Sequence, residues 1–151
     1  MAARELVLRG APTVTPALVD AVLGREGSPL AGLGDYICAR GRRDGIDPVF
    51  LLAFVSEFDA TRALSPAVHN VGHLSAVAGQ PSQDGYRQFA TWRDGIDAWY
   101  ALVQGLYLDQ WNLTTLDAMV PVYAPGPAAQ VEDQVNRLHA LVASWRALSA
   151  A

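Results

Sequence analysis

The pattern of apolar and polar positions divides the chain into helical segments separated by turn-forming residues. Thr15, placed before a proline, is typical of a helix start, and the apolar spacing that follows predicts a helix over 16–24. A second short helix is predicted over 34–40, and Gly41 is expected to end it. The chain therefore begins as a helical protein.

A run of apolar residues, 49–55, follows Asp47 and Pro48. Aspartate can cap a helix and proline fits its first turn, so this start favours a helix over a buried strand. Because the run is apolar on every side, we expect this helix at the centre of the fold. Glu57 falls on its last turn, two positions beyond the run.

Helical spacing is lost over residues 61–90, where turn-forming residues accumulate. We expect a loop-rich lobe here that can include a small β-hairpin, and loops of this length usually carry function. Helical spacing returns after Thr91, whose hydroxyl is placed to cap the next helix. A short helix that Thr114 caps and Pro121 ends is predicted next, and a long one over about 128–147.

The composition fits a fold class that is mainly α. The 151 residues are 51% hydrophobic and 17% charged, which is enough apolar sequence for a single domain over 1–151 with about five to seven helices. A net charge of −4 without a basic stripe argues against nucleic acid as a partner. No apolar stretch is long enough to predict a membrane span, and the first residues lack the apolar core of a secretory signal.

Metal and cofactor chemistry find little support in the sequence. His69 and His73 have a spacing that would suit a metal on a helix, but residues 70–72 between them predict a turn. His139, the other histidine, belongs to the last predicted helix, and Cys38, without a second cysteine, is interpreted as a core residue. Phosphate-binding and serine-hydrolase motifs are absent. We therefore predict no metal and no cofactor.

Glu57 is the main candidate for a catalytic group. A carboxyl group at the end of a buried helix loses water on its core side, and desolvation favours the protonated form. Such a group can donate a proton to a leaving-group oxygen, as glycoside hydrolysis requires. Spacing alone favours an ordinary glutamate at a helix end over a catalytic acid. Asp59 is expected to point away and nothing places Asp84, so no second carboxylate is assigned.

The order of these segments resembles the glucosaminidase-type domains of the lysozyme-like superfamily, which occur in bacterial and phage cell-wall hydrolases. The resemblance extends from about Arg9 to Arg146 and includes an apolar helix that ends in the catalytic glutamate. The matching segments, in chain order, are 10–13, 27–29, 45–48, Glu57, 70–74, 89–96, 123–125 and 145–146.

The resemblance implies hydrolysis of the β-1,4 bonds of peptidoglycan, with Glu57 as general acid and a site of action at the cell wall or outside the cytoplasm. Tyr123 would help to shape the cleft. Candidate substrate-binding residues come from the matching segments and from aromatic residues in irregular regions, because rings pack against sugars. They are Asn70, His73, Tyr86, Phe89, Trp92 and Tyr123.

Two alternatives stay open. The first is a catalytically degenerate module that binds glycan or has a structural role; Phe58 follows the glutamate where the family usually has Ser or Thr, and His73 stands where Asn is common. The second is a lytic transglycosylase, which also uses one glutamate but closes an anhydro ring. The sequence leaves the oligomeric state open.

Overall fold

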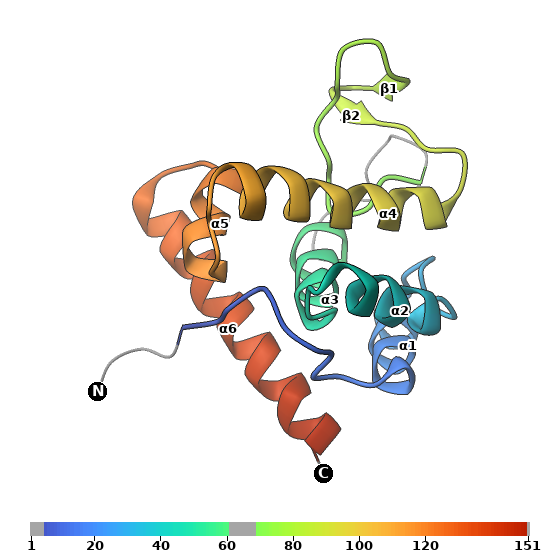
Figure 1. Ribbon diagram of the computed structural model, residues 1–151, viewed down its shortest axis with the longest axis vertical. Helices are drawn as coiled ribbons and strands as arrows, with labels where there is room; N and C mark the ends of the chain where they lie inside the picture. The colour runs from blue at the N-terminus through green and yellow to red at the C-terminus, as the bar shows by residue number, and fades with distance from the viewer. Residues whose placement is uncertain (1–4, 61–68, 151) are drawn as a thin grey trace.

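The computed structural model describes residues 5–60 and 69–150, with the side chains of 59 and 60 left out. Within these residues the fold is mainly α, as predicted, and Figure 1 shows its helices arranged around α3. The α-helices are α1 (Pro16–Arg25), α2 (Gly34–Asp44), α3 (Val49–Val55), α4 (Trp92–Leu102), α5 (Leu116–Tyr123) and α6 (Ala128–Ala150). Two π-helical segments, η1 (Ser56–Ala60) and η2 (Val103–Gln110), continue α3 and α4, and the strands are β1 (Ser82–Gln83) and β2 (Tyr86–Arg87).

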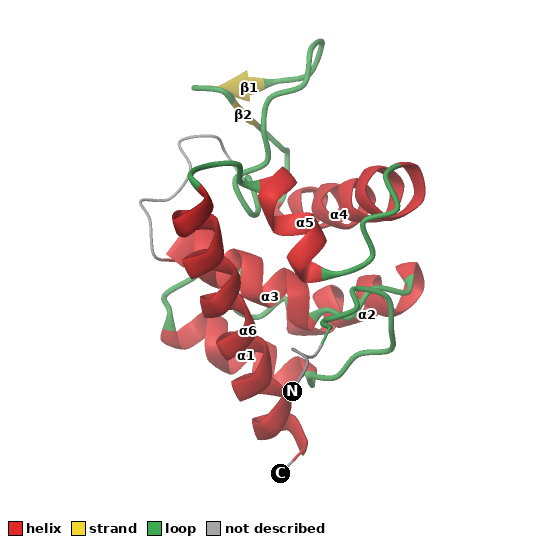
Figure 2. Cartoon of the chain, turned by 90° about the vertical axis from the view of Figure 1, so that its left-hand side faces the viewer, coloured by secondary structure: helices red, strands yellow, loops and turns green. Residues whose placement is uncertain are grey.

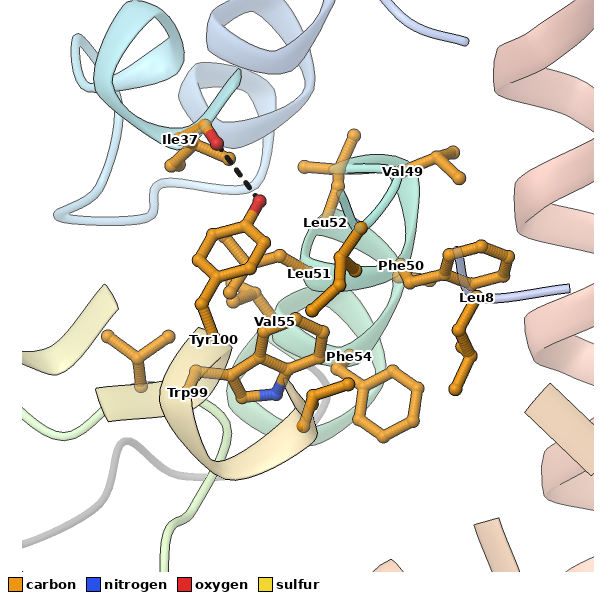
Figure 3. Close-up of a cluster of buried hydrophobic side chains, with 14 of the residues drawn as sticks. Leu8, Ile37, Val49, Phe50, Leu51, Leu52, Phe54, Val55, Trp99 and Tyr100 are labelled. Atoms are coloured by element: carbon orange, nitrogen blue, oxygen red, sulfur yellow. Dashed lines mark hydrogen bonds between the residues drawn. The ribbon is translucent and has the colours of Figure 1, made fainter. Parts of the chain in front are cut away.

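The core is built around α3, all of whose residues are buried. In Figure 3 its side chains meet Trp99 and Tyr100 of α4, and the Tyr100 hydroxyl donates a 2.9 Å hydrogen bond to the Ile37 carbonyl of α2. Each large side chain of this kind stabilises the fold by about 1.5–3 kcal/mol when it is fully buried. The central position predicted for this helix is confirmed.

The predicted helix caps at Thr15 and Thr91 are present. The Thr15 hydroxyl accepts a 3.1 Å hydrogen bond from the Leu18 amide, and the Thr91 hydroxyl accepts one of 3.1 Å from the Asp94 amide. Each bond satisfies an amide that has no partner within its own helix. Cys38 is buried in α2, and burial raises the pKa of its thiol to about 11, so its predicted place in the core is also confirmed.

Helix α2 does not end at Gly41, as the sequence suggested, but continues to Asp44. Gly45 follows in the left-handed region (φ 72°) and ends the helix. Gly41 is needed for close packing instead: a Cβ atom there would lie 3.0 Å from the Tyr100 hydroxyl and 2.7 Å from the Ile46 carbonyl oxygen. A glycine that allows two elements to approach looks, in the sequence, like a glycine that ends a helix.

The start of α5 also differs from the prediction. Thr115, and not Thr114, caps the helix by accepting a 3.2 Å hydrogen bond from the Ala118 amide, since the Thr114 carbonyl is already bonded to the Leu8 amide. Pro121 lies inside the helix instead of ending it, at an exposed position two residues before the end of α5. The last helix extends three residues beyond the predicted end, to Ala150.

The described part of the loop-rich lobe contains the small hairpin that the sequence allowed for. Strands β1 and β2 are antiparallel, with Ser82 opposite Arg87 and Gln83 opposite Tyr86. Asp84 and Gly85 form the turn with φ values of 51° and 84°, which is the left-handed pair that two-residue hairpins favour. Figures 1 and 2 show the hairpin standing out from the helices at the end of the molecule opposite the C-terminus.

Among the described residues, no helix combines the length and the apolar character that are needed to cross a membrane.

Candidate functional site

Glu57 lies in the π-helical segment that follows α3, not on a final α-helical turn as predicted. A π-turn takes one more residue than an α-turn, and such turns are frequent at functional sites. Both Glu57 and Phe58 are buried here, with exposed fractions of 6% and 2%. The π-turn thus places two buried side chains, a carboxylate and an aromatic ring, at consecutive positions.

The Glu57 carboxylate is paired with Arg137 of α6. The Nε atom of Arg137 donates to Oε1 at 2.9 Å and to Oε2 at 3.3 Å, and its Nη2 atom lies 2.8 Å from Oε1. The hydrogen bond to Glu57 raises the pKa of Arg137. Hydrogen bonds between two charged groups at these distances are among the stronger ones in proteins, so the pair ties η1 to α6.

A pocket of about 360 Å³ opens beside this pair. Its volume is at the small end of the range for ligand sites, about 300–1,000 Å³. Its lining comes from η1 and from one face of α6: Ser56, Glu57, Arg137, Ala140 and Leu141. Among these residues, only the Glu57–Arg137 pair is charged.

A second carboxylate lies near this pocket, directly after the last residue of α1. The Ser56 hydroxyl donates a hydrogen bond to Oε1 of Glu26, which is the C-cap residue of α1. The Oε2 atom of Glu26 is buried and has no hydrogen-bond partner among the residues that the structure describes. Of the carboxylates considered from the sequence, Asp84 lies in the exposed hairpin turn, and the side chain of Asp59 is outside the described residues.

Asn70 organises the loop that leads into the hairpin. Its side-chain amide donates to the carbonyl oxygens of Leu74 (2.9 Å) and Arg87 (2.7 Å), and its oxygen accepts from the Leu74 amide (2.7 Å). The side chain is 4% exposed. Its described contacts therefore hold the 70–74 turn against β2, and any effect on a ligand would be exerted through that turn.

Three other predicted residues of the lobe, His73, Tyr86 and Trp92, take part in two aromatic pairs. The rings of His73 and Tyr86 meet edge to face at 5.3 Å, and those of His69 and Trp92 do so at 5.0 Å. His69 also places Nδ1 2.8 Å from the carbonyl oxygen of Phe89. All of these side chains are partly exposed, so they form a half-buried aromatic surface between the hairpin and the start of α4.

Tyr123 connects the segment after Glu57 with this lobe. Its hydroxyl donates a hydrogen bond to the Gly72 carbonyl oxygen, and its ring packs against Phe54 at 4.6 Å and Phe58 at 5.3 Å. Phe58 is thus part of the contact that orients Tyr123.

The structure brings the predicted residues together only in part. Tyr123, the 70–74 turn and the hairpin form one connected set, whereas the described lining of the pocket beside Glu57 contains none of the six predicted substrate-binding residues. Arg137, Ser56 and Glu26 were missed. The only sequence signal for Arg137 is that it shares a helical face with Ala140 and Leu141, at spacings of three and four.

Comparisons of the chain with protein-family models, with curated proteins and with solved structures found no match. Within the described residues, no group of three or more His, Cys, Asp or Glu side chains is arranged to hold a metal ion.

Proposed function

We propose that the chain is a lysozyme-like hydrolase of peptidoglycan and that Glu57 is its general acid. One observation carries this proposal: Glu57 is 6% exposed, lies on a π-turn at the end of a buried helix, and lines a pocket. A carboxyl group that lines a pocket and has little access to bulk water is placed to deliver a proton to the oxygen of a bound ligand.

In the proposed reaction, Glu57 donates its proton to the oxygen of the glycosidic bond as the bond to the anomeric carbon breaks. The oxygen of a water molecule adds to that carbon, and a proton of this water restores the acid. The products are two sugar chains, one of which carries a new reducing end.

A non-catalytic glycan-binding module is the second candidate, and the ion pair favours it. A carboxylate that stays bonded to Arg137 has no proton to donate. In that case the pocket and the aromatic surface of the lobe would bind amino sugars without cleaving them.

Clearing of a peptidoglycan suspension tests the first candidate. Wild-type protein is expected to clear it, and Glu57→Gln should lower the rate by at least about 10²-fold, because an amide cannot act as the acid. Glu132→Gln, at an exposed glutamate of α6, is the matched control and should clear like the wild type. Equal clearing by Glu57→Gln would remove Glu57 from the mechanism.

The second candidate predicts a different set of results. Neither wild type nor Glu57→Gln would clear the suspension, yet both would sediment with insoluble peptidoglycan. If clearing occurs, mass spectrometry of the products separates hydrolysis, which leaves reducing ends, from transglycosylation, which leaves anhydro ends.

A further inference from the structure

His69 has a strained backbone conformation in the loop before the hairpin. Its φ angle of 57° lies in the left-handed region, which a bulky side chain rarely adopts. The surrounding fold holds it there: a Cβ atom at Gly95 would lie 2.3 Å from the His69 carbonyl oxygen, so only a glycine lets α4 approach this closely. On the other side, the neighbouring Asn70 is bonded to Leu74 and Arg87. Strain that a fold maintains in this way is found mainly at functional sites.

The imidazole of His69 is also held in one tautomer. Its Nδ1 atom lies 2.8 Å from the carbonyl oxygen of Phe89. Because a carbonyl oxygen can only accept, Nδ1 carries the hydrogen and donates it. In the neutral imidazole, Nε2 then has a free lone pair and acts as an acceptor. Within the described residues Nε2 has no hydrogen-bond partner, and the side chain is partly exposed. His69 therefore presents an oriented acceptor at the surface of the lobe.

The neighbours of this acceptor are aromatic. The ring of His69 meets the ring of Trp92 edge to face, with 5.0 Å between their centroids, and both Trp92 and Phe89 are partly exposed. A sugar ring carries hydroxyl or amide donors at its edge and apolar C–H groups on its faces, so it matches an acceptor set among aromatic side chains. A carboxylate or a phosphate oxygen without a hydrogen has nothing to donate to Nε2. The arrangement thus favours a sugar ring that brings a donor.

We propose that His69 binds the glycan directly, and that its Nε2 atom accepts a hydrogen bond from a donor on a sugar ring that lies beside Trp92. The inference rests on the proposed function for its choice of ligand, but it requires neither Glu57 nor cleavage, since a hydrolase and a binding module would use the same contact. The donor is either a hydroxyl group or the N–H of an acetamido group. Chitotriose carries both kinds of donor and cellotriose carries only hydroxyls, so the two sugars distinguish them.

Calorimetric titration of wild type and His69→Asn with the two sugars tests the proposal. The variant removes Nε2 but keeps an amide that can donate to the Phe89 carbonyl, and asparagine tolerates the left-handed conformation. Its affinity for chitotriose should fall about three- to tenfold, the loss expected for one hydrogen bond. Weakening of chitotriose alone identifies the amide N–H as the donor, and equal weakening of both sugars identifies a hydroxyl. His139→Asn, at a histidine of α6 whose Nε2 already bonds to Asp117, is the matched control and should bind like the wild type.

Nitrogen NMR of wild-type protein labelled in its histidines tests the contact without a substitution. His69 should show the tautomer with hydrogen on Nδ1, and its Nε2 resonance should move upfield when chitotriose is added, because the lone pair becomes a hydrogen-bond acceptor. The resonances of His139 should stay in place. The signals of His69 are assigned by their loss in His69→Asn. An Nε2 resonance that does not move at saturating chitotriose would overturn the proposal, as would unchanged affinity of His69→Asn.

Clearing of peptidoglycan separates failure of this inference from failure of the proposed function. His69→Asn should raise the apparent KM about three- to tenfold and leave kcat within about twofold, as loss of a binding contact does. If Glu57→Gln is inactive while His69→Asn clears with the wild-type KM, the role of His69 is overturned and the proposed function stands. Wild type that binds chitotriose through His69 but clears nothing supports the role of His69 and refutes hydrolysis. If wild type binds neither chitotriose nor insoluble peptidoglycan, both are overturned.

Discussion

At the scale of single residues, the side chain of Asn70 bonds to backbone groups in two separate parts of the lobe. It joins Leu74, four residues along the chain, to Arg87 in β2. Asparagine provides both donors and an acceptor in one plane, so a single buried side chain can satisfy three backbone groups. A region with a hairpin of only two residue pairs depends on such contacts, because its strands alone supply few hydrogen bonds.

Replacement of Asn70 by alanine should therefore destabilise the protein. The change leaves buried backbone groups without partners, and we expect the free energy of unfolding to fall by about 2–4 kcal/mol. Urea denaturation followed by circular dichroism measures this value. Asn136→Ala, at an exposed asparagine of α6, should change it by less than about 0.5 kcal/mol. Similar values for the two variants would show that the lobe does not depend on Asn70.

At the scale of elements, the two neighbouring threonines before α5 give a sharp test of the cap. Thr115→Ala removes the hydroxyl that accepts from the Ala118 amide and should cost about 1 kcal/mol. Thr114→Ala, next to it and exposed, should cost less than about 0.5 kcal/mol. Thermal or urea unfolding of the two variants measures the difference. A larger loss for Thr114→Ala would place the cap where the sequence alone suggested.

The helices could be predicted because their signals are local. The caps at Thr15 and Thr91, the apolar run 49–55 and the Asp84–Gly85 turn all act within a few residues of their position. The errors arose where a residue serves a distant partner. Gly41 is small because Tyr100 packs against it, and nothing within α2 reveals this.

The candidate site shows the same difference between local signals, which could be predicted, and contacts between distant residues, which could not. Glu57 stands out in the sequence because an apolar run leads to it, whereas its partner Arg137 follows 80 residues later. Their contact depends on α6 packing against α3 and η1, which is a property of the complete fold. The π-turn was also not predictable, since Ser56–Ala60 contains no proline, glycine or other local signal that distinguishes it from a last α-helical turn.

At the scale of the whole molecule, Asp47 joins both ends of the chain to the central helix. Its carboxylate accepts hydrogen bonds from the Thr13 amide and hydroxyl, from the Val49 amide at the start of α3, and from Arg146 near the end of α6. Asp47 is 2% exposed. Several donors, among them the buried Val49 amide, therefore depend on one buried carboxylate.

Asp47→Ala should lower the free energy of unfolding by about 2–4 kcal/mol, because it leaves the buried Val49 amide and the part-buried Thr13 amide without their partner and removes the counter-charge of Arg146. Asp109→Ala is the matched control: it breaks the ion pair with Arg9, which also ties the N-terminal segment to the helices, but 46% and 60% of these two side chains are exposed. Such a pair contributes at most about 1 kcal/mol. Urea denaturation measures the free energy of unfolding of both variants. A larger loss for Asp47→Ala is expected because its carboxylate is buried. Equal losses for the two variants would show that the burial of Asp47 makes no difference to stability.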